Sequence, residues 1–183
     1  MNIHQLSVHH DERQDRLLLR LNTKDQQEFR FWLTRRMTLR LLPAIEKTAV
    51  RLESAQPGVA ATDAPAQHLL TEIKRDAFLQ QADFATPFDN HATQWPLGVE
   101  PLLITDAHLT IKPGGTLEVA FEDKSDAAQV KSCQLHLQVS LVHGMVHLIR
   151  QANEKAEWGS LGIPAIATEA SPAATSEPPR YAH

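Results

Sequence analysis

The chain has 183 residues, of which 42% are apolar and 22% are charged, and its formal net charge is −4. This composition excludes wholesale disorder, and the acidic balance excludes a uniformly basic, histone-like binder. No apolar run reaches about 18 residues, so no membrane-spanning helix is expected. Residues 1–5 lack a signal-peptide pattern, and the single Cys133 cannot form an internal disulfide. These features predict a bacterial-style cytoplasmic protein.

The first fifty residues alternate between apolar and polar positions, with polar turns at 11–15 and 22–25. Such alternation predicts three antiparallel strands with one buried face. The apolar positions are Leu6 and Val8, then Leu17, Leu19 and Leu21, then Phe29, Phe31 and Leu33. Thr34 is expected to cap a helix that ends near residue 54, because its hydroxyl can accept a hydrogen bond from a free N–H group of the first turn. Pro43 is expected to kink this helix, since proline has no N–H group.

The middle of the chain joins this unit to a second one. Residues 55–65 are typical of a linker, and residues 66–82 are expected to form a helix. The predicted buried stripe of that helix consists of Leu69, Leu70, Ile73, Ala77 and Phe78. Residues 83–101 contain three prolines and include Phe88 and Trp95, which are expected to pin an irregular loop.

From residue 102 the opening pattern returns, with a hairpin turn at Pro113-Gly114-Gly115 and a longer loop at 123–131. The alternating apolar positions are Leu109 and Ile111, then Leu117, Val119 and Phe121, then Leu135, Leu137, Val139 and Leu141. A helix is expected over about 142–157. Residues 159–183 are rich in Pro, Ala, Ser, Thr and Glu and are expected to be a disordered tail.

The two halves align as an internal repeat. Phe29, Phe31 and Leu33 fall on Leu137, Val139 and Leu141, and Leu17, Leu19 and Leu21 fall on Leu117, Val119 and Phe121. We therefore expect an α+β fold of two β-β-β-α repeats, 1–54 and 102–158, joined by the region 55–101. Because each repeat alone is too small for a good core, packing as a pseudo-two-fold unit is the expected solution.

This order of elements resembles, in topology only, the Whirly and PUR groups of single-stranded nucleic-acid-binding proteins. That resemblance implies a nucleic-acid platform, although those proteins usually have four strands per repeat and none of their sequence motifs is present. The segment Glu28-Phe29-Arg30-Phe31-Trp32-Leu33-Thr34-Arg35-Arg36-Met37 resembles the hallmark of an uncharacterised bacterial family. The similarity covers about the first fifty residues and implies no known activity.

Positive charge is concentrated in the first repeat. Residues 1–55 carry ten Lys and Arg against seven Asp and Glu, whereas residues 56–100 carry two against six. Strand parity places Arg16, Arg20, Arg30 and Trp32 on the outer face of the first sheet, and Arg35, Arg36 and Arg40 follow at the helix start. Arginine interleaved with tryptophan suits a single-stranded nucleic acid, but it also suits a protein interface. A third possibility is that the linking helix or residues 83–101 cover this face. For the arginines at the helix start, the alternative to an acidic partner is a salt bridge to Asp11, Glu12 or Asp15.

Catalytic and metal-binding patterns are weak. The chain has no Gly-rich phosphate loop and no nucleophile elbow, and Cys133 opens an apolar strand as a packed residue would. The only metal candidates are His136, His143 and His147, the last two being four residues apart on the expected helix.

The sequence thus favours non-enzymatic macromolecular binding, without catalytic residues or cofactors. The partner-binding candidates are Arg16, Arg20, Arg30, Trp32, Arg35 and Arg36. The expected partner is a protein or a second copy in a homodimer. Single-stranded nucleic-acid binding and histidine-based metal binding are the alternatives.

Overall fold

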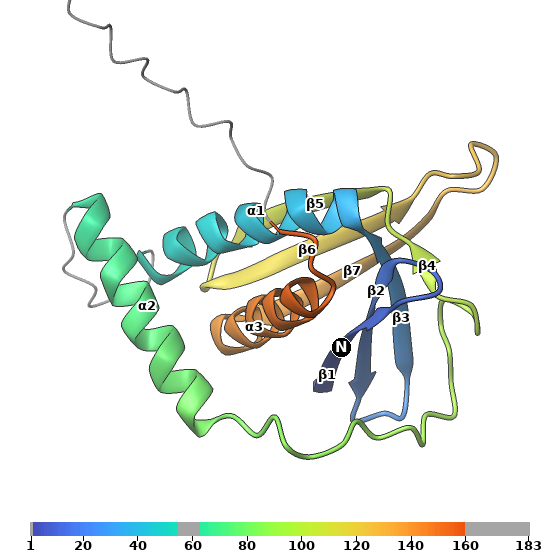
Figure 1. Cartoon of the computed structure of the whole chain (residues 1–183), viewed down its shortest axis with the longest axis horizontal. Coiled ribbons are helices and arrows are strands. Elements are labelled where there is room, and N and C mark those ends of the chain that lie inside the picture. The colour runs from blue at the N-terminus through green and yellow to red at the C-terminus, as the bar shows by residue number, and fades with distance from the viewer. Residues whose placement is uncertain (1, 55–62, 160–183) are drawn as a thin grey trace, which may run out of the picture.

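The computed structural model describes residues 2–54 and 63–159 (Figure 1). The expected tail from residue 160 onward and most of the expected linker lie outside the described residues. The first unit consists of β1 (Ile3–Asp11), β2 (Arg16–Thr23), β3 (Glu28–Thr34) and α1 (Arg35–Ser54). The connecting region holds α2 (Ala64–Gln81) and β4 (Leu102–Leu103). The second unit consists of β5 (Asp106–Lys112), β6 (Thr116–Asp123), β7 (Lys131–Gln138) and α3 (Val139–Lys155).

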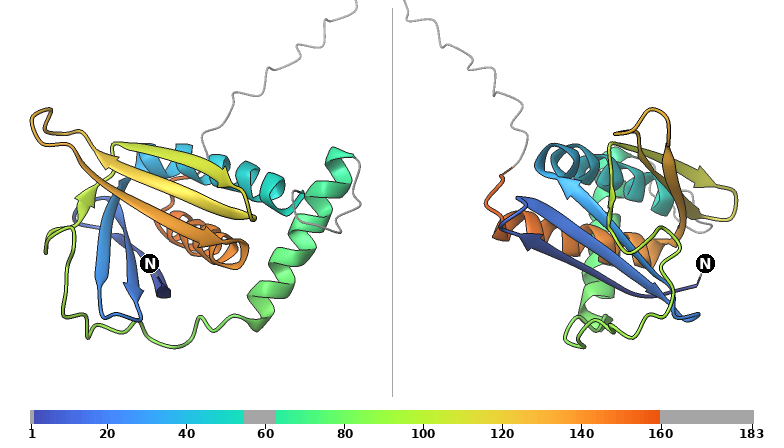
Figure 2. Two further views of the ribbon diagram at one scale, coloured as in Figure 1. Left: turned by 180° about the vertical axis from the view of Figure 1, so that it is seen from behind. Right: turned by 90° about the vertical axis from the view of Figure 1, so that its right-hand side faces the viewer.

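The α+β fold of two β-β-β-α units is confirmed. One sheet has the order β1-β2-β3-β4 and the other β5-β6-β7, and both meanders are antiparallel. α1 and α3 pack against each other, α3 also contacts β1, and α1 also contacts β5. α2 crosses near one end of α1 and α3, as Figures 1 and 2 show.

One hydrophobic core joins both units. The inward positions of β2, β3, β6 and β7 form a single buried cluster with α1 and α3. Phe31 of the first sheet meets Phe121 of the second, with ring centroids 5.1 Å apart. Because each sheet has only one apolar face, the two units bury these faces together rather than separately.

Strand register corrects the expected repeat alignment. Leu17 pairs with Leu33, and the matching Leu117 pairs with Leu137. Leu33 therefore corresponds to Leu137. The expected match of Leu33 to Leu141 is wrong by four residues. α3 already begins at Val139, because apolar residues of a buried helix start can continue the alternation of the preceding strand. The pseudo-two-fold relation between the units stays a prediction.

The first sheet has a fourth strand that the sequence did not predict. Leu102 and Leu103 pair in parallel with Phe31 and Trp32 of β3. Residues 102–103 thus belong to the first sheet, and the first strand of the second unit starts at Asp106. A strand of two residues is too short to show a period in the sequence.

α2 exposes part of the stripe that was expected to be buried. Leu69 is 58% exposed and Ile73 is 57% exposed, and Ala77 is exposed as well. Leu70 and Phe78, which also belong to the expected stripe, are half-buried, and Phe78 lies against His143 of α3. The expected stripe is therefore wrong for Leu69, Ile73 and Ala77, and the helix buries the polar Thr71.

The expected start of the first helix is confirmed. Thr34 Oγ1 accepts a hydrogen bond from the Met37 N–H group at 3.2 Å. The helix includes Pro43 and is described as far as Ser54. Cys133 is 7% exposed, and burial raises the pKa of its thiol to about 11. No helix within residues 2–54 and 63–159 combines the length and apolar character needed to cross a bilayer.

Candidate functional site

Arg20 and Arg30, two of the expected partner-binding cations, are held by one buried carboxylate. Arg20 Nε donates to Glu28 Oε1 at 2.7 Å, and Arg30 Nη2 donates to Glu28 Oε2 at 2.9 Å. The Glu28 side chain is only 1% exposed. Sequence reasoning missed this residue, although Glu28 has the same strand parity as Arg30 and Trp32 and so lies on the same face.

The charge state of Glu28 follows from these contacts. Burial alone would raise the pKa of the Glu28 carboxyl, but the hydrogen bonds and charges of Arg30 and Arg20 together hold it below its ordinary value. Glu28 is therefore ionised near neutral pH and neutralises charge on the outer face.

Residues 83–101 lie over the part of the outer face that holds Arg20 and Arg30. The Arg20 guanidinium lies 4.2 Å from the centroid of the Phe88 ring, and its Nη2 donates to Asn90 Oδ1 at 2.6 Å. Arg30 donates to the Val99 carbonyl oxygen at 3.3 Å and lies 5.8 Å from the Trp95 ring centroid. Phe88 and Trp95 thus contact the sheet through its cations, and Arg20 and Arg30 are already engaged within the chain.

The other four candidates lie nearer the start of α1. Arg16 and Trp32 are half-buried, and Arg36 is exposed; none of the three side chains has a hydrogen bond or ion pair with a described residue. Arg35 donates from Nη2 to the Trp158 carbonyl oxygen at 3.1 Å. The six predicted residues therefore have different surroundings and do not form a single surface.

The nearby acids do not neutralise the helix arginines. Asp11 accepts hydrogen bonds from the backbone N–H groups of Arg13 and Gln14. Asp15 accepts from Trp158 Nε1 at 2.9 Å, and Glu12 is exposed. The expected alternative, salt bridges from these acids to Arg35, Arg36 or Arg40, is absent among the described residues.

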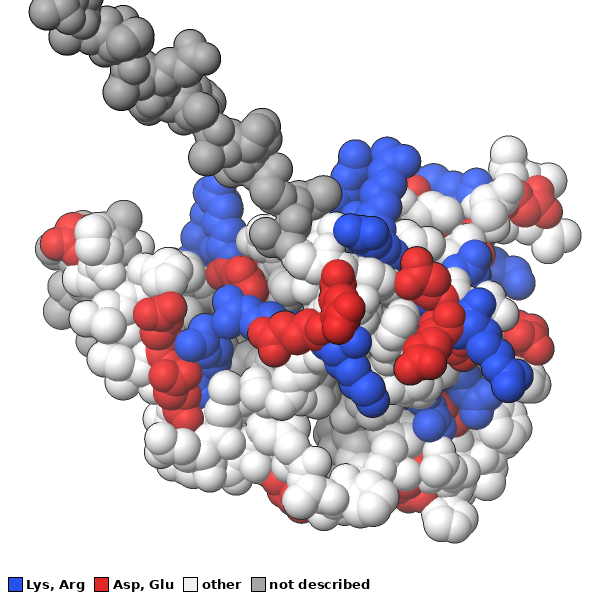
Figure 3. All heavy atoms as spheres, in the orientation of Figure 1, with Lys and Arg blue, Asp and Glu red and all other residues white. Residues whose placement is uncertain are grey.

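A row of cations runs along the exposed side of α1. Its members, called the α1 cationic stripe from here on, are Arg36, Arg40, Lys47 and Arg51. At 100° per residue their spacing places all four within about 60° of one helix face, over a length of about 22 Å. All four are exposed, and none forms an ion pair or hydrogen bond with a described residue. Figure 3 shows Lys and Arg side chains along the edge of the molecule above α1.

The stripe begins beside the edge of the first sheet. A hollow of about 280 Å³ lies there, lined by Arg36 and Arg40 together with Thr34 and Leu103. Leu103 pairs with Trp32 across β3 and β4. The 4-7-4 spacing of the stripe was visible in the sequence, but its exposure and the absence of acidic partners required the structure.

The three metal candidates contact different groups. His136 Nε2 lies 3.1 Å from Glu118 Oε2, and His143 Nε2 lies 3.2 Å from Glu53 Oε1. The His147 ring lies near the Phe84 ring, with centroids 4.9 Å apart and the ring planes tilted at 46°. In the part of the chain that the structure describes, no three His, Cys, Asp or Glu side chains are grouped as metal ligands.

Comparison with known proteins assigns no relative. No family model, no curated protein and no solved structure matches the chain. The candidate site therefore rests on the residues and geometry of this chain alone.

Proposed function

We propose that the protein binds the phosphate backbone of a nucleic acid through the α1 cationic stripe. The observation that carries the proposal is that four exposed cations share one helix face without an acidic partner among the described residues. Unpaired cations near one another repel. The phosphates of a nucleic acid relieve this repulsion, and the cations condensed on the nucleic acid are released when it binds.

The composition of the stripe favours a nucleic acid over a protein partner. Protein interfaces have a buried apolar centre surrounded by a polar rim. Between its cations the stripe offers only the exposed Pro43 and Ala44. Phosphate contacts need cations alone, because they fix the position of the strand without an apolar pocket.

The proposed surface differs from the one the sequence favoured. Arg20 and Arg30 are excluded from it, since Glu28 and residues 83–101 engage both. Arg36 is retained, and Arg40, Lys47 and Arg51 extend the surface along α1. Trp32 lies one strand from the hollow at the start of the stripe and supplies a ring for base stacking.

The test is a titration of the full chain against a fluorescently labelled 20-nucleotide single strand and a 20-base-pair duplex, followed by anisotropy. We expect binding at about 50 mM salt, with an affinity that falls steeply as salt rises. The double variant Arg36→Gln with Arg40→Gln should lower the affinity and reduce the slope of log K against log salt by about two. The two substrates distinguish single-stranded from double-stranded binding.

A matched control separates the stripe from the general charge of the protein. Lys24 is exposed, and its side chain has no described partner. It lies in the turn between β2 and β3, whereas α1 follows the other end of β3. The variant Lys24→Gln should bind as the parent does, whereas Arg36→Gln alone should lower the affinity and reduce the slope by about one. The proposal fails if neither oligonucleotide binds at low salt, or if Lys24→Gln and Arg36→Gln weaken binding equally.

A further inference from the structure

The hollow at the start of the α1 cationic stripe lies between α1 and β4 and has a volume of about 280 Å³. Arg36 and Arg40 line it from α1, and neither side chain has a hydrogen bond or ion pair with a described residue. Figure 3 shows Lys and Arg side chains gathered over this end of α1. The hollow therefore opens to two cations that an anionic ligand can engage.

The opposite wall of the hollow is main chain at the edge of the first sheet. Three consecutive residues, Leu103, Ile104 and Thr105, line it. Ile104 donates its N–H group to the Trp32 carbonyl oxygen at 3.0 Å, so the polar groups of Ile104 face β3. Those of the preceding Leu103 point the other way, toward the edge of β4 that no described strand covers. This edge thus offers the hollow one N–H donor and one C=O acceptor.

An aromatic side chain adjoins this wall on the outer face of the sheet. Trp32 pairs with Leu103, and their neighbours Phe31 and Leu102 are buried in the core. Because successive side chains of a strand point to opposite faces, those of Trp32 and Leu103 both lie on the outer face. Both are half-buried, so an apolar surface continues from the hollow onto the sheet.

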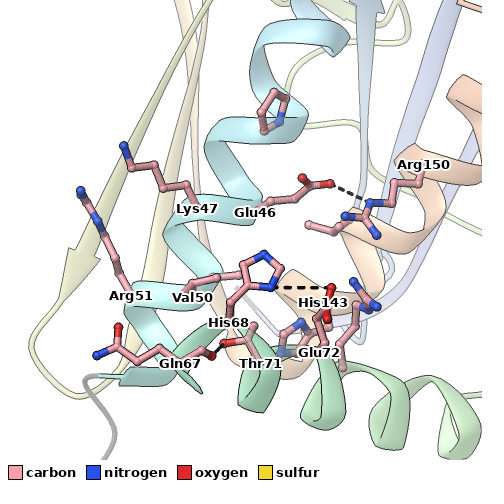
Figure 4. A pocket seen from close by; sticks show the side chains of 14 residues that line it. Glu46, Lys47, Val50, Arg51, Gln67, His68, Thr71, Glu72, His143 and Arg150 are labelled. Atoms are coloured by element: carbon pink, nitrogen blue, oxygen red, sulfur yellow. Dashed lines mark hydrogen bonds and ion pairs between the residues drawn. The ribbon is translucent and has the colours of Figure 1, made fainter. Parts of the chain in front are cut away.

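The larger cavity between α1, α2 and α3 is arranged differently. In Figure 4 the side chains of Lys47 and Arg51 point away from it, which leaves both cations on the outer side of α1. Arg150 Nε donates to Glu46 Oε1 at 2.7 Å across that cavity. The hollow beside β4 is therefore the cavity to which free cations of the stripe open.

We propose that this hollow receives one unpaired base of a single-stranded nucleic acid, an inference that rests on the proposed function. The base accepts a hydrogen bond from the Leu103 N–H group and donates one to the Leu103 carbonyl oxygen, since every base has both kinds of group on its pairing edge. The phosphates on either side of this base meet Arg36 and Arg40, which are about 6 Å apart along α1. That separation is close to the distance between neighbouring phosphates of an extended strand. A neighbouring base stacks on the Trp32 ring.

A duplex cannot make the same contact. The pairing edges of its bases are occupied by their partners, and only the groove edges of the bases are accessible. Its phosphates alone would meet the stripe. The bases of a single strand are free to be stacked and hydrogen-bonded one at a time, so single strands are the substrate class that uses the hollow.

The test compares two fluorescently labelled strands with the same number of phosphates. One is oligothymidylate of about ten nucleotides, and the other is the same backbone with abasic sugars throughout. Binding to the full chain is followed by anisotropy at about 50 mM salt. We expect the abasic strand to bind at least about fivefold more weakly, because it keeps the phosphate contacts and loses those of the bases.

A variant locates the contact at the main chain of β4. Leu103→Pro removes the N–H group that faces the hollow, and the ladder between β3 and β4 does not use this group, so an edge strand tolerates the change. The variant should weaken binding of oligothymidylate at least about fivefold and leave the abasic strand unchanged. Leu103→Ala is the matched control, because it keeps the N–H group, and it should weaken oligothymidylate less than Leu103→Pro does.

If Leu103→Pro fails to fold, the amide signal of Leu103 in a proton–nitrogen correlation spectrum of the parent decides the point. It should move when oligothymidylate is added and stay in place with the abasic strand. The inference is overturned if the two strands bind equally or move this signal equally. Equal binding that depends on Arg36 and Arg40 would leave the proposed function intact, whereas failure of both strands to bind would refute both proposals.

Discussion

At the scale of single residues, Glu28 is the group on which the outer face of the first sheet depends. Replacing it by Gln leaves Arg20 and Arg30 without their shared anion in a partly buried setting. We expect Glu28→Gln to lower the free energy of unfolding by about 3 kcal/mol, measured by urea denaturation. Glu12→Gln, at an exposed turn position, should change it by less than about 0.5 kcal/mol.

Glu28 also makes the stability of the fold depend on pH in the acid range. The pKa of Glu28 lies below its ordinary value of 4.5 in the folded chain, so the carboxylate stabilises the fold above that value. This contribution is lost as pH falls through the lowered pKa. The stability difference between the parent and Glu28→Gln should therefore narrow as pH falls from about 5 to about 3, and a gap that stays constant would contradict this role.

At the scale of elements, α2 is the helix whose packing the sequence misjudged. Its apolar residues Leu69 and Ile73 face solvent, whereas Lys74 reaches the buried Glu53 and Phe78 lies near His143. We expect Leu69→Ala and Ile73→Ala each to change stability by less than about 0.5 kcal/mol. Phe78→Ala, at a half-buried site, should cost about 2 kcal/mol. Equal losses in chemical denaturation would mean that Leu69 and Ile73 are packed as closely as Phe78.

The incorrect prediction for α2 shows when the spacing of apolar residues predicts the buried face of an element. The strands and α1 could be predicted because one face of each meets an apolar core, and periodicity reports such a face directly. α2 instead packs against Glu53 and His143, and hydrophobic spacing carries no information about a polar neighbour. The candidate site follows the same division. Arg36 and Arg40 were singled out from the sequence, whereas Lys47 and Arg51, which continue their helical spacing, were not. The pairing of Arg20 and Arg30 with Glu28 depends on residues brought together by folding.

At the scale of the whole molecule, the two units depend on each other. Each contributes one apolar sheet face to a single core, and Phe31 contacts Phe121 across the boundary between them. The order of elements was predictable because the repeat is visible in the alternation of both halves. Their relative placement was not, since it arises from contacts such as α3 with β1 and α1 with β5, which join positions far apart in the sequence.

A shared core makes unfolding of the units cooperative. The three tryptophans, Trp32, Trp95 and Trp158, all lie outside the strands of the second unit, whereas Phe121 is a fully buried residue of β6. We expect Phe121→Ala to lower the free energy of unfolding by about 3 to 4 kcal/mol. The urea midpoint should fall, and tryptophan fluorescence and far-UV circular dichroism should report the same new midpoint. Ile111→Ala, at a position 36% exposed on the edge strand β5, should cost less than about 1 kcal/mol. If the fluorescence midpoint of Phe121→Ala stayed at the parental value while the dichroism midpoint fell, the first unit would be stable without the second and the single core would be refuted.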